Sequence, residues 1–378
     1  MEPVIDVAKL GPQAQRILDP KTPAGMRMMA ARGIAPGLKP VDTLAILAVL
    51  AESSDAALAA LAQATIDKLP PQLLNGALTP DLHPGVLDVV APRYATDAAM
   101  MERMLGLPQM PLETIARVAM KSSEEVSELI ATNEDRLLKH PPIIERLYMN
   151  KATRMSTSDR MIELAVRNNI ELHGIPAFKE AVQALSEELI PVDPPDGPTP
   201  EDIAFKEVAA IAAELGADPE LAAATHETDE ETGLEVPVAK MKPLYARIGE
   251  MKTGQKIRLA QMGGGPERAL LVRDPDRRVS VAAIKNPNVQ DNEVARVSAS
   301  RNVSEDVLRC IAGDSKWTRN HQVKVNLVSN PRCPLQLSSG LIPHLREHEL
   351  KAIARSKNVS GAISRAAKQQ LERKGIKL

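Results

Sequence analysis

Aromatic residues are scarce in this chain of 378 residues, which contains one Trp, three Tyr and two Phe. β-Sandwiches, β-barrels and base-stacking surfaces rely on a larger aromatic supply. The core must therefore be built from Ala, Leu, Val, Ile and Met, and this composition favours closely packed helices.

Cysteine is almost absent as well, since Cys310 and Cys333 are the only two. They form neither a disulfide framework nor a metal-binding spacing, and a reducing compartment suits such a chain. No apolar run approaches the roughly 20 residues of a membrane span. The opening sequence "MEPVIDVAKLGPQAQ" lacks the basic and apolar regions of a secretory signal. We therefore expect a cytoplasmic protein.

Charge is distributed unevenly along the chain, although the net charge is only −2. Residues 1–185 carry 19 basic and 22 acidic residues, residues 186–240 carry 2 and 15, and residues 241–378 carry 26 and 12. An acidic middle segment thus separates a nearly neutral front from a basic back half.

Short helices account for most of the sequence pattern. Apolar residues recur at three- and four-residue spacing in runs of about 9–13 residues, each opened by a proline or a capping residue. No alternating run of useful length predicts a strand. In residues 41–70 the caps Ser53, Ser54 and Asp55 predict a break between two helices, and Pro70 ends the second.

These patterns predict four segments. Residues 1–39 are rich in Pro and Gly, and we expect them to be partly ordered. Residues 40–186 form an N-terminal helical repeat domain. Residues 187–236 form an acidic, Pro-rich linker with one helix, capped by Thr199 and ending near Gly216. Residues 237–378 form a basic C-terminal helical repeat domain.

The two helical domains resemble each other. Ala-Arg-Val at residues 116–118 aligns with the same tripeptide at 295–297, and Asn150 aligns with Asn330. The offset between the aligned positions stays near 180 residues.

A shorter echo appears within the back half. "VSVAAIKNPN" (279–288) matches "VKVNLVSNPR" (323–332), and "VARVSASRNVS" (294–304) matches "LKAIARSKNVS" (350–360). Short helices joined by Asn-Pro turns, with self-similarity at about 40–45 residues, predict an all-α, bipartite α-solenoid of short stacked helices.

Residues 272–312 and 100–119 carry a resemblance to a known class. Their Ala-ending helices with regularly spaced apolar residues and their "Asn-Pro-x" turn resemble the HEAT and leucine-rich-repeat-variant class of α-solenoid proteins. The chain is also similar to uncharacterised repeat proteins of myxobacteria. The resemblance implies a fold and a binding style, and it implies no catalytic residue.

The segment "HLREH" (344–348) has the form of the inverted zinc-protease signature, with two histidines and a general-base glutamate. Such a site needs a third ligand farther along the chain, and only Glu349 and Glu372 remain as carboxylates there. The solvent-exposed face of a repeat helix is the favoured interpretation, and we expect no metal and no cofactor.

Three consecutive glycines (263–265) precede a predicted helix that contains Arg268. Their N–H groups suit an anion, but no Gly-Lys-Ser/Thr follows and no strand precedes. A turn between stacked helices is the favoured interpretation. Because the chain also offers no Ser-His-Asp or Cys-His arrangement, we expect a non-enzymatic protein.

The basic back half indicates a binding surface. We expect a scaffold protein that binds an acidic protein partner through its solenoid surfaces. The alternative is binding to a nucleic-acid backbone, which the scarcity of aromatics disfavours. The candidate partner-binding residues are Arg296, Arg301, Arg309, Lys316, Arg319 and Lys324.

Asn-Val-Ser occurs at residues 302–304 and again at 358–360, in the form of a glycosylation sequon. In a helical array the motif predicts a helix-to-helix joint. Asn302 would take the left-handed conformation, and Ser304 and Ser360 would cap the next helices. Val303 would pack on Leu308. At the matching place in the front half, Ser122 and Glu125 would form a capping box.

Overall fold

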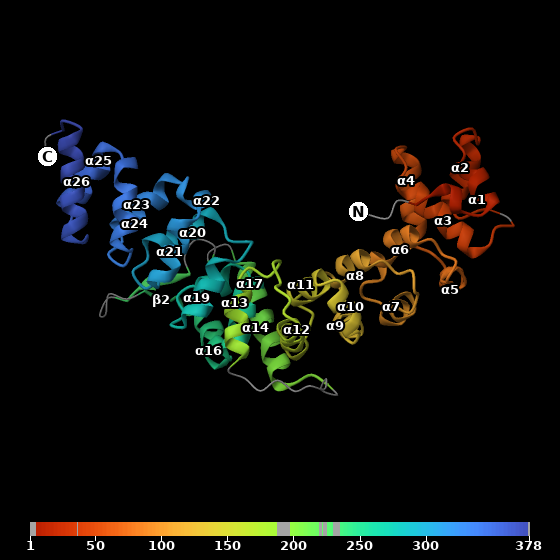
Figure 1. The fold of residues 1–378 in the computed structure, drawn as a ribbon, viewed down its shortest axis with the longest axis horizontal. Helices are drawn as coiled ribbons and strands as arrows, with labels where there is room; N and C mark the ends of the chain where they lie inside the picture. Colours follow the sequence, from red (N-terminus) through yellow and green to blue (C-terminus); the bar gives the residue numbers. More distant parts are fainter. Residues whose placement is uncertain are drawn as a thin grey trace. The chain divides into compact units, whose positions relative to one another are not determined.

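The computed structural model of the chain describes residues 5–35, 37–186, 197–218, 221, 225–229 and 235–376. The chain divides into two compact units, Met1–Gly174 and Ile175–Leu378. Both are built of short helices (Figure 1), which confirms the all-α prediction. In the described part of the chain, no helix is long and apolar enough to cross a membrane.

The first unit consists of helices along its described length. In chain order they are η1 (Val7–Lys9), α1 (Pro12–Leu18), α2 (Ala24–Ala31), α3 (Pro40–Ala51), α4 (Ala56–Ile66), α5 (Pro71–Ala77), α6 (Pro84–Val90), η2 (Ala91–Tyr94), α7 (Ala98–Leu105), α8 (Leu112–Ala119), α9 (Glu124–Ala131), α10 (Glu134–Lys139), α11 (Pro142–Tyr148) and α12 (Met155–Arg167). Three of these helices lie within residues 1–39, the segment expected to be partly ordered.

The second unit contains helices and one pair of short strands. In chain order they are α13 (Phe178–Leu185), α14 (Pro200–Gly216), β1 (His226–Thr228), β2 (Glu235–Pro237), η3 (Ala239–Met241), α16 (Lys242–Glu250), α17 (Thr253–Met262), α18 (Gly265–Leu271), α19 (Arg277–Ile284), α20 (Asp291–Ala299), α21 (Glu305–Gly313), α22 (Ser315–Thr318), α23 (His321–Ser329), α24 (Leu335–Leu341), η4 (Ile342–His344), α25 (Glu347–Arg355) and α26 (Gly361–Arg373).

Helix α13 belongs to the second unit, although the sequence placed it at the end of the N-terminal domain. The Lys285 ammonium on the chain after α19 lies 2.8 Å from a Glu180 carboxylate oxygen on α13. Contacts therefore place the boundary at Gly174, while the Pro-rich sequence placed it at residue 186. Residues 187–196, the first part of the expected linker, lie outside the described residues.

Buried asparagines hold stacked helices together in both units. Each directly follows a helix or its last turn, and its side-chain amide donates to two carbonyl groups at the end of an earlier helix. The donor–acceptor distances are Asn150 to Ala119 O and Ser122 O, 2.8 Å each; Asn286 to Ala260 O, 2.8 Å, and Gly263 O, 3.2 Å; and Asn330 to Ser298 O, 2.9 Å, and Ser300 O, 2.8 Å.

The side-chain oxygen of each asparagine accepts a bond from the backbone N–H two residues later, in Ala152, Asn288 and Arg332. One side chain thus pairs three backbone groups at a joint where helix ends leave carbonyls unpaired. We call this arrangement the asparagine clamp. It gives a physical reason why Asn150 aligns with Asn330, and why "NPN" (286–288) aligns with "NPR" (330–332).

The clamps also show how many residues separate two contacting helices in the sequence. The asparagines reach back 31, 26 and 32 residues to their first acceptors. Other side chains bridge similar separations: Arg154 to Glu124 (30), Arg136 to Leu105 O (31), Arg268 to Glu293 (25) and His321 to Glu349 (28). Neighbouring helices are therefore closer in sequence than the 40–45 residues that the echo predicted.

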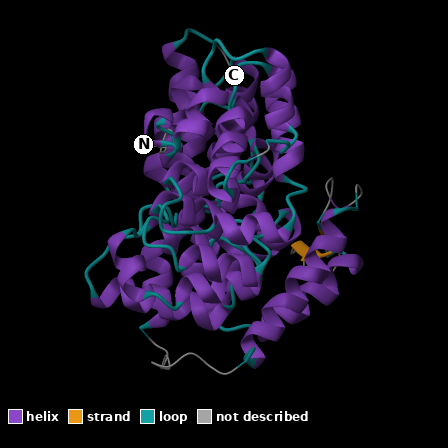
Figure 2. Ribbon diagram, turned by 90° about the vertical axis from the view of Figure 1, so that its right-hand side faces the viewer, coloured by secondary structure: helices purple, strands orange, loops and turns teal. Residues whose placement is uncertain are grey.

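The strands are an element that the sequence analysis missed. Strand β1 pairs antiparallel with β2 (orange in Figure 2). In this pairing Thr228 lies opposite Glu235. Both strands lie in the acidic segment that was expected to form a linker with one helix. Three-residue strands are too short to produce the alternating pattern that sequence analysis relies on.

The two Asn-Val-Ser joints confirm the predicted caps. Ser304 accepts a bond from Val307 N at the start of α21, and Ser360 accepts one from Ile363 N at the start of α26. Val303 and Leu308 are both fully buried.

Two details of the joint predictions were wrong. Asn302 is not among the residues with positive φ, and its side chain instead donates to Glu235 O at 3.1 Å. The cap of α9 is Ser123 rather than Ser122, whose hydroxyl lies in a buried network with Asn150 and Ser127. Asn302 bonds to Glu235 and Ser122 bonds to Asn150. Both partners are distant in sequence, so the local pattern does not reveal these bonds.

Replacing Asn330 with Ala should lower the free energy of unfolding by about 2–4 kcal/mol, because two carbonyls and one N–H lose their partner at a buried joint. The urea midpoint at neutral pH measures this change. Asn358→Ala is the control, because Asn358 is exposed and should change stability by less than about 0.5 kcal/mol. Equal effects of the two changes would contradict the clamp.

Stability should also fall in acid because of His226 on β1. Burial and the nearby Arg273 lower the pKa of His226 from 6.5 to about 4, and Glu235 opposes the shift. The unfolded chain therefore binds this proton more readily, so stability is full above pH 6.5 and decreases as the pH falls towards 4. Urea midpoints at pH 7 and pH 4.5 should differ more in the wild type than in His226→Gln. An unchanged pH dependence in the variant would contradict this role of His226.

Candidate functional site

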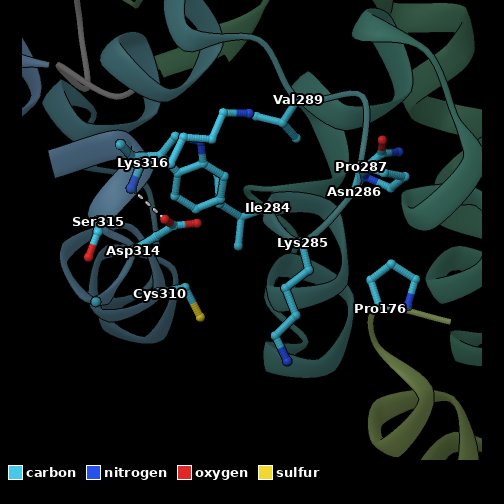
Figure 3. Close-up of a pocket in the computed structure, with 12 residues that line it drawn as sticks. Pro176, Ile284, Lys285, Asn286, Pro287, Val289, Cys310, Asp314, Ser315 and Lys316 are labelled. Atoms are coloured by element: carbon cyan, nitrogen blue, oxygen red, sulfur yellow. Dashed lines mark hydrogen bonds between the residues drawn. The ribbon is translucent and has the colours of Figure 1, made fainter. Parts of the chain in front are cut away.

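A hollow of about 650 Å³ lies in the second unit, between the loop that follows α19 and the junction of α21 with α22 (Figure 3). A second hollow of about 490 Å³ shares Pro287, Val289 and Lys316 with it. We call the two together the groove. Residues from 284–292 and 310–317, together with Pro176, line the groove.

Hydrogen bonds at helix ends fix both walls of the groove. On one side, the clamp of Asn286 holds the turn that contains Pro287. On the other side, the Asp314 carboxylate caps α22 by accepting a bond from Lys316 N at 2.7 Å (Figure 3). The backbone of both walls is therefore set by the fold before any ligand arrives.

The lining combines apolar surface with one available cation. Pro176, Ile284, Pro287 and Val289 contribute aliphatic surface, and Trp317 is the only tryptophan of the chain. Lys316 is exposed, and its ammonium group has no ion-pair partner among the described residues. The Trp317 indole N–H is buried and lacks an acceptor within the same residues. The exposed lining suits a ligand with apolar side chains and a carboxylate.

Two other ionisable groups of the groove are engaged by the fold itself, whereas the Asp291 carboxylate is exposed in the first turn of α20. Lys285 pairs with Glu180, and the Asp314 carboxylate serves as a helix cap. Burial raises the pKa of the Cys310 thiol, so the thiol stays protonated at neutral pH. A protonated thiol is a poor nucleophile. This arrangement suits recognition better than covalent chemistry.

The predicted partner-binding residues are spread over four consecutive helices and their joints. Lys316 lines both hollows of the groove. Arg309 forms an ion pair with Glu305 one turn earlier on α21. The remaining four are placed as follows: Arg296 on α20, Arg301 in the joint after α20, Arg319 directly after α22, and Lys324 on α23.

The acidic segment pairs with the first part of the basic half. The ion pairs are Glu201–Lys252 (3.2 Å), Glu207–Arg247 (3.7 Å), Asp218–Lys240 (2.8 Å) and Glu235–Arg273 (2.8 Å). In addition, the guanidinium of the fully buried Arg258 lies 5.1 Å from the ring centre of Phe205 on α14. The acidic segment therefore pairs with four basic residues between 240 and 273, and among the described residues no ion pair joins it to Lys316.

The two histidines of "HLREH" do not share a helical face. His344 ends η4, Leu345 is extended and buried, and His348 lies in the first turn of α25. Glu349 accepts a bond from Arg346 N and lies 2.8 Å from His321 Nε2. Among the described residues, no group of three or more His, Cys, Asp or Glu side chains could hold a metal ion.

The three glycines form a tight turn between α17 and α18. A Cβ atom on Gly263 would lie 2.5 Å from Leu259 O, so the close approach requires glycine. Arg268, the expected anion contact, donates to Gly263 O and forms a partly buried ion pair with Glu293. This geometry supports the turn interpretation.

Sequence reasoning found Lys316 but missed Trp317 and Pro287, which shape the groove. Both signals were present, since Trp317 is unique and Pro287 lies in an Asn-Pro turn. Their significance depends on packing that brings residues 284–289 next to 310–317.

No family model matches the chain, and no curated protein matches its sequence. Among solved structures, it is similar to an engineered protein whose crystal structure was determined by the Northeast Structural Genomics Consortium. The two chains share 12% identity, with a TM-score of 0.21 over 97% of this chain and 98% of the other. A TM-score this low carries no argument about fold or function.

Replacing Gln261 with Met should leave stability unchanged or raise it by up to about 1 kcal/mol. Gln261 on α17 is fully buried, and neither atom of its amide has a partner among the described residues. The change removes two unpaired polar atoms at similar volume. Gln255→Met on the same helix is the matched control, because the buried Gln255 accepts a bond from Lys252 N at 2.9 Å. The control should lose about 1 kcal/mol, and the reverse order of urea midpoints would contradict this interpretation.

Proposed function

We propose that the chain is a non-enzymatic binding protein that holds an extended, acidic segment of a protein partner in the groove. The observation that carries the proposal is the lining of the groove, where aliphatic surface and Trp317 lie beside the unpaired Lys316. Apolar surface supplies affinity, and a cation at the edge selects a carboxylate.

The repeat architecture supports this mode of binding. Hydrogen bonds from a side chain to a side-chain or backbone group 25–32 residues away recur in both units, as expected for a stack in which each helix contacts its neighbours. We infer an α-solenoid arrangement of the HEAT or leucine-rich-repeat-variant kind on this basis. Such arrays bind partners along surfaces formed by successive joints, and the groove lies at two such joints.

Free thiols support a reducing location. Cys310 and Cys333 are both unpaired, and burial raises the pKa of each. A cytoplasmic location agrees with this state of the cysteines.

Trp317 provides a direct readout, because no other tryptophan contributes to the emission. Titration with a Trp-free decapeptide of alternating Leu and Glu should change the emission saturably. An otherwise identical peptide with Lys in place of Glu should not. Lys316→Glu should weaken binding of the acidic peptide at least tenfold, about 1.4 kcal/mol. Lys368→Glu on α26 is the matched control, since Lys368 is exposed and does not line the groove, and it should bind as the wild type does.

Two results would contradict the proposal. One is an acidic peptide that leaves the emission of Trp317 unchanged. The other is tighter binding of a ten-nucleotide oligothymidylate, lost in Lys316→Glu, which would favour a nucleic-acid backbone as the ligand.

A further inference from the structure

Glu235 of β2 links the strand pair to the helical part of the second unit through both its side chain and its main chain. The Glu235 carboxylate accepts bonds from Arg273 Nη2 at 2.8 Å, Arg273 Nε at 3.0 Å and the Ser300 hydroxyl at 2.8 Å. The backbone carbonyl of the same residue accepts a bond from the Asn302 side chain at 3.1 Å. Side chain and main chain of a single strand residue are therefore recognised together.

These contacts lie outside the regular spacing of the helical stack. Glu235 is 38, 65 and 67 residues from Arg273, Ser300 and Asn302, whereas contacts between stacked helices span 25–32 residues. The contacts of Glu235 are therefore distinct from the regular contacts between one helix and the next.

The three partner residues are positioned by the helical array itself. Arg273 Nη1 donates to Ala269 O on the preceding turn, which orients the guanidinium. The Ser300 hydroxyl accepts a bond from Asn302 N, and Ser300 is 3% exposed. Cations and hydroxyl donors held in advance are the features of a carboxylate-binding site.

A second joint has the same local geometry without such an occupant. Asn358 N donates to the Ser356 hydroxyl at 3.1 Å, as Asn302 N does to Ser300. The Asn358 side chain is exposed, and none of its hydrogen bonds involves a described acidic residue. The Ser-x-Asn turn therefore forms without a bound carboxylate, so Glu235 is not needed to build it.

We propose that Arg273, Ser300 and Asn302 form a docking site for a glutamate in an extended peptide, and that Glu235 of the same chain occupies this site in the free protein. An acidic strand from a partner binds there by displacing Glu235. The site shares no lining residue with the groove, so its test is independent of the function proposed above.

A labelled synthetic peptide that copies residues 225–238, "THETDEETGLEVPV", tests the proposal on the full chain by fluorescence anisotropy. Glu235→Ala, which removes the carboxylate from Arg273 and Ser300 and keeps the main-chain carbonyl, should bind the peptide at least tenfold more tightly than the wild type. Arg273→Ala added to Glu235→Ala should abolish that gain. A peptide with Gln at the position of Glu235 should bind Glu235→Ala at least tenfold more weakly.

Circular dichroism of each variant verifies that its helices are intact. Glu235→Gln, which preserves side-chain volume, replaces Glu235→Ala if the latter loses helical signal. Equal binding by the wild type and the Glu235 variant would overturn the proposal. Binding that survives the loss of Arg273 would overturn it as well, and Glu235 would then be a structural link alone.

Discussion

The asparagine clamp is the interaction on which the rest of the structure depends. A helix that ends against its neighbour leaves carbonyl groups without partners, and water cannot reach them at a buried joint. Asn150, Asn286 and Asn330 each solve this problem with one amide, which pairs two carbonyls of the earlier helix and one N–H of the following turn. A hydroxyl has a single donor hydrogen and cannot donate to two carbonyls, and an apolar side chain can pair none of the three groups. The repeated asparagine is therefore explained by backbone pairing.

The clamp also determines the shape of the groove. In the second unit, the turn that Asn286 fixes carries Pro287 into one wall of the groove. Asp314 fixes the opposite wall by capping α22, the helix that carries Lys316 and Trp317. The groups that hold the helices together thus also shape the hollow between them. We infer that the affinity of the groove for a ligand depends on the rigidity of these joints.

Much of the helical fold could be predicted from local pattern, because caps and prolines mark helix ends directly. Asp55, Thr199, Ser304 and Ser360 cap helices as expected. The errors share a cause. Asn302 and the strand pair depend on one another across more than 60 residues, and Ser122 is drawn into a network around Asn150. For the groove, the charge pattern of the sequence predicted Lys316. The hollow itself and the position of Trp317 could not be predicted, because both depend on packing between turns that are distant in sequence.

Acrylamide quenching of Trp317 fluorescence tests most directly whether the Asn286 clamp holds the groove in its shape. Asn286→Ala should raise the quenching constant well above that of the wild type, because the turn at Pro287 loses its anchor while the helices remain. Asn330→Ala removes an equivalent clamp whose residues do not line the groove, and its constant should stay near the wild-type value. Equal quenching in both variants, or no change in Asn286→Ala, would contradict the account.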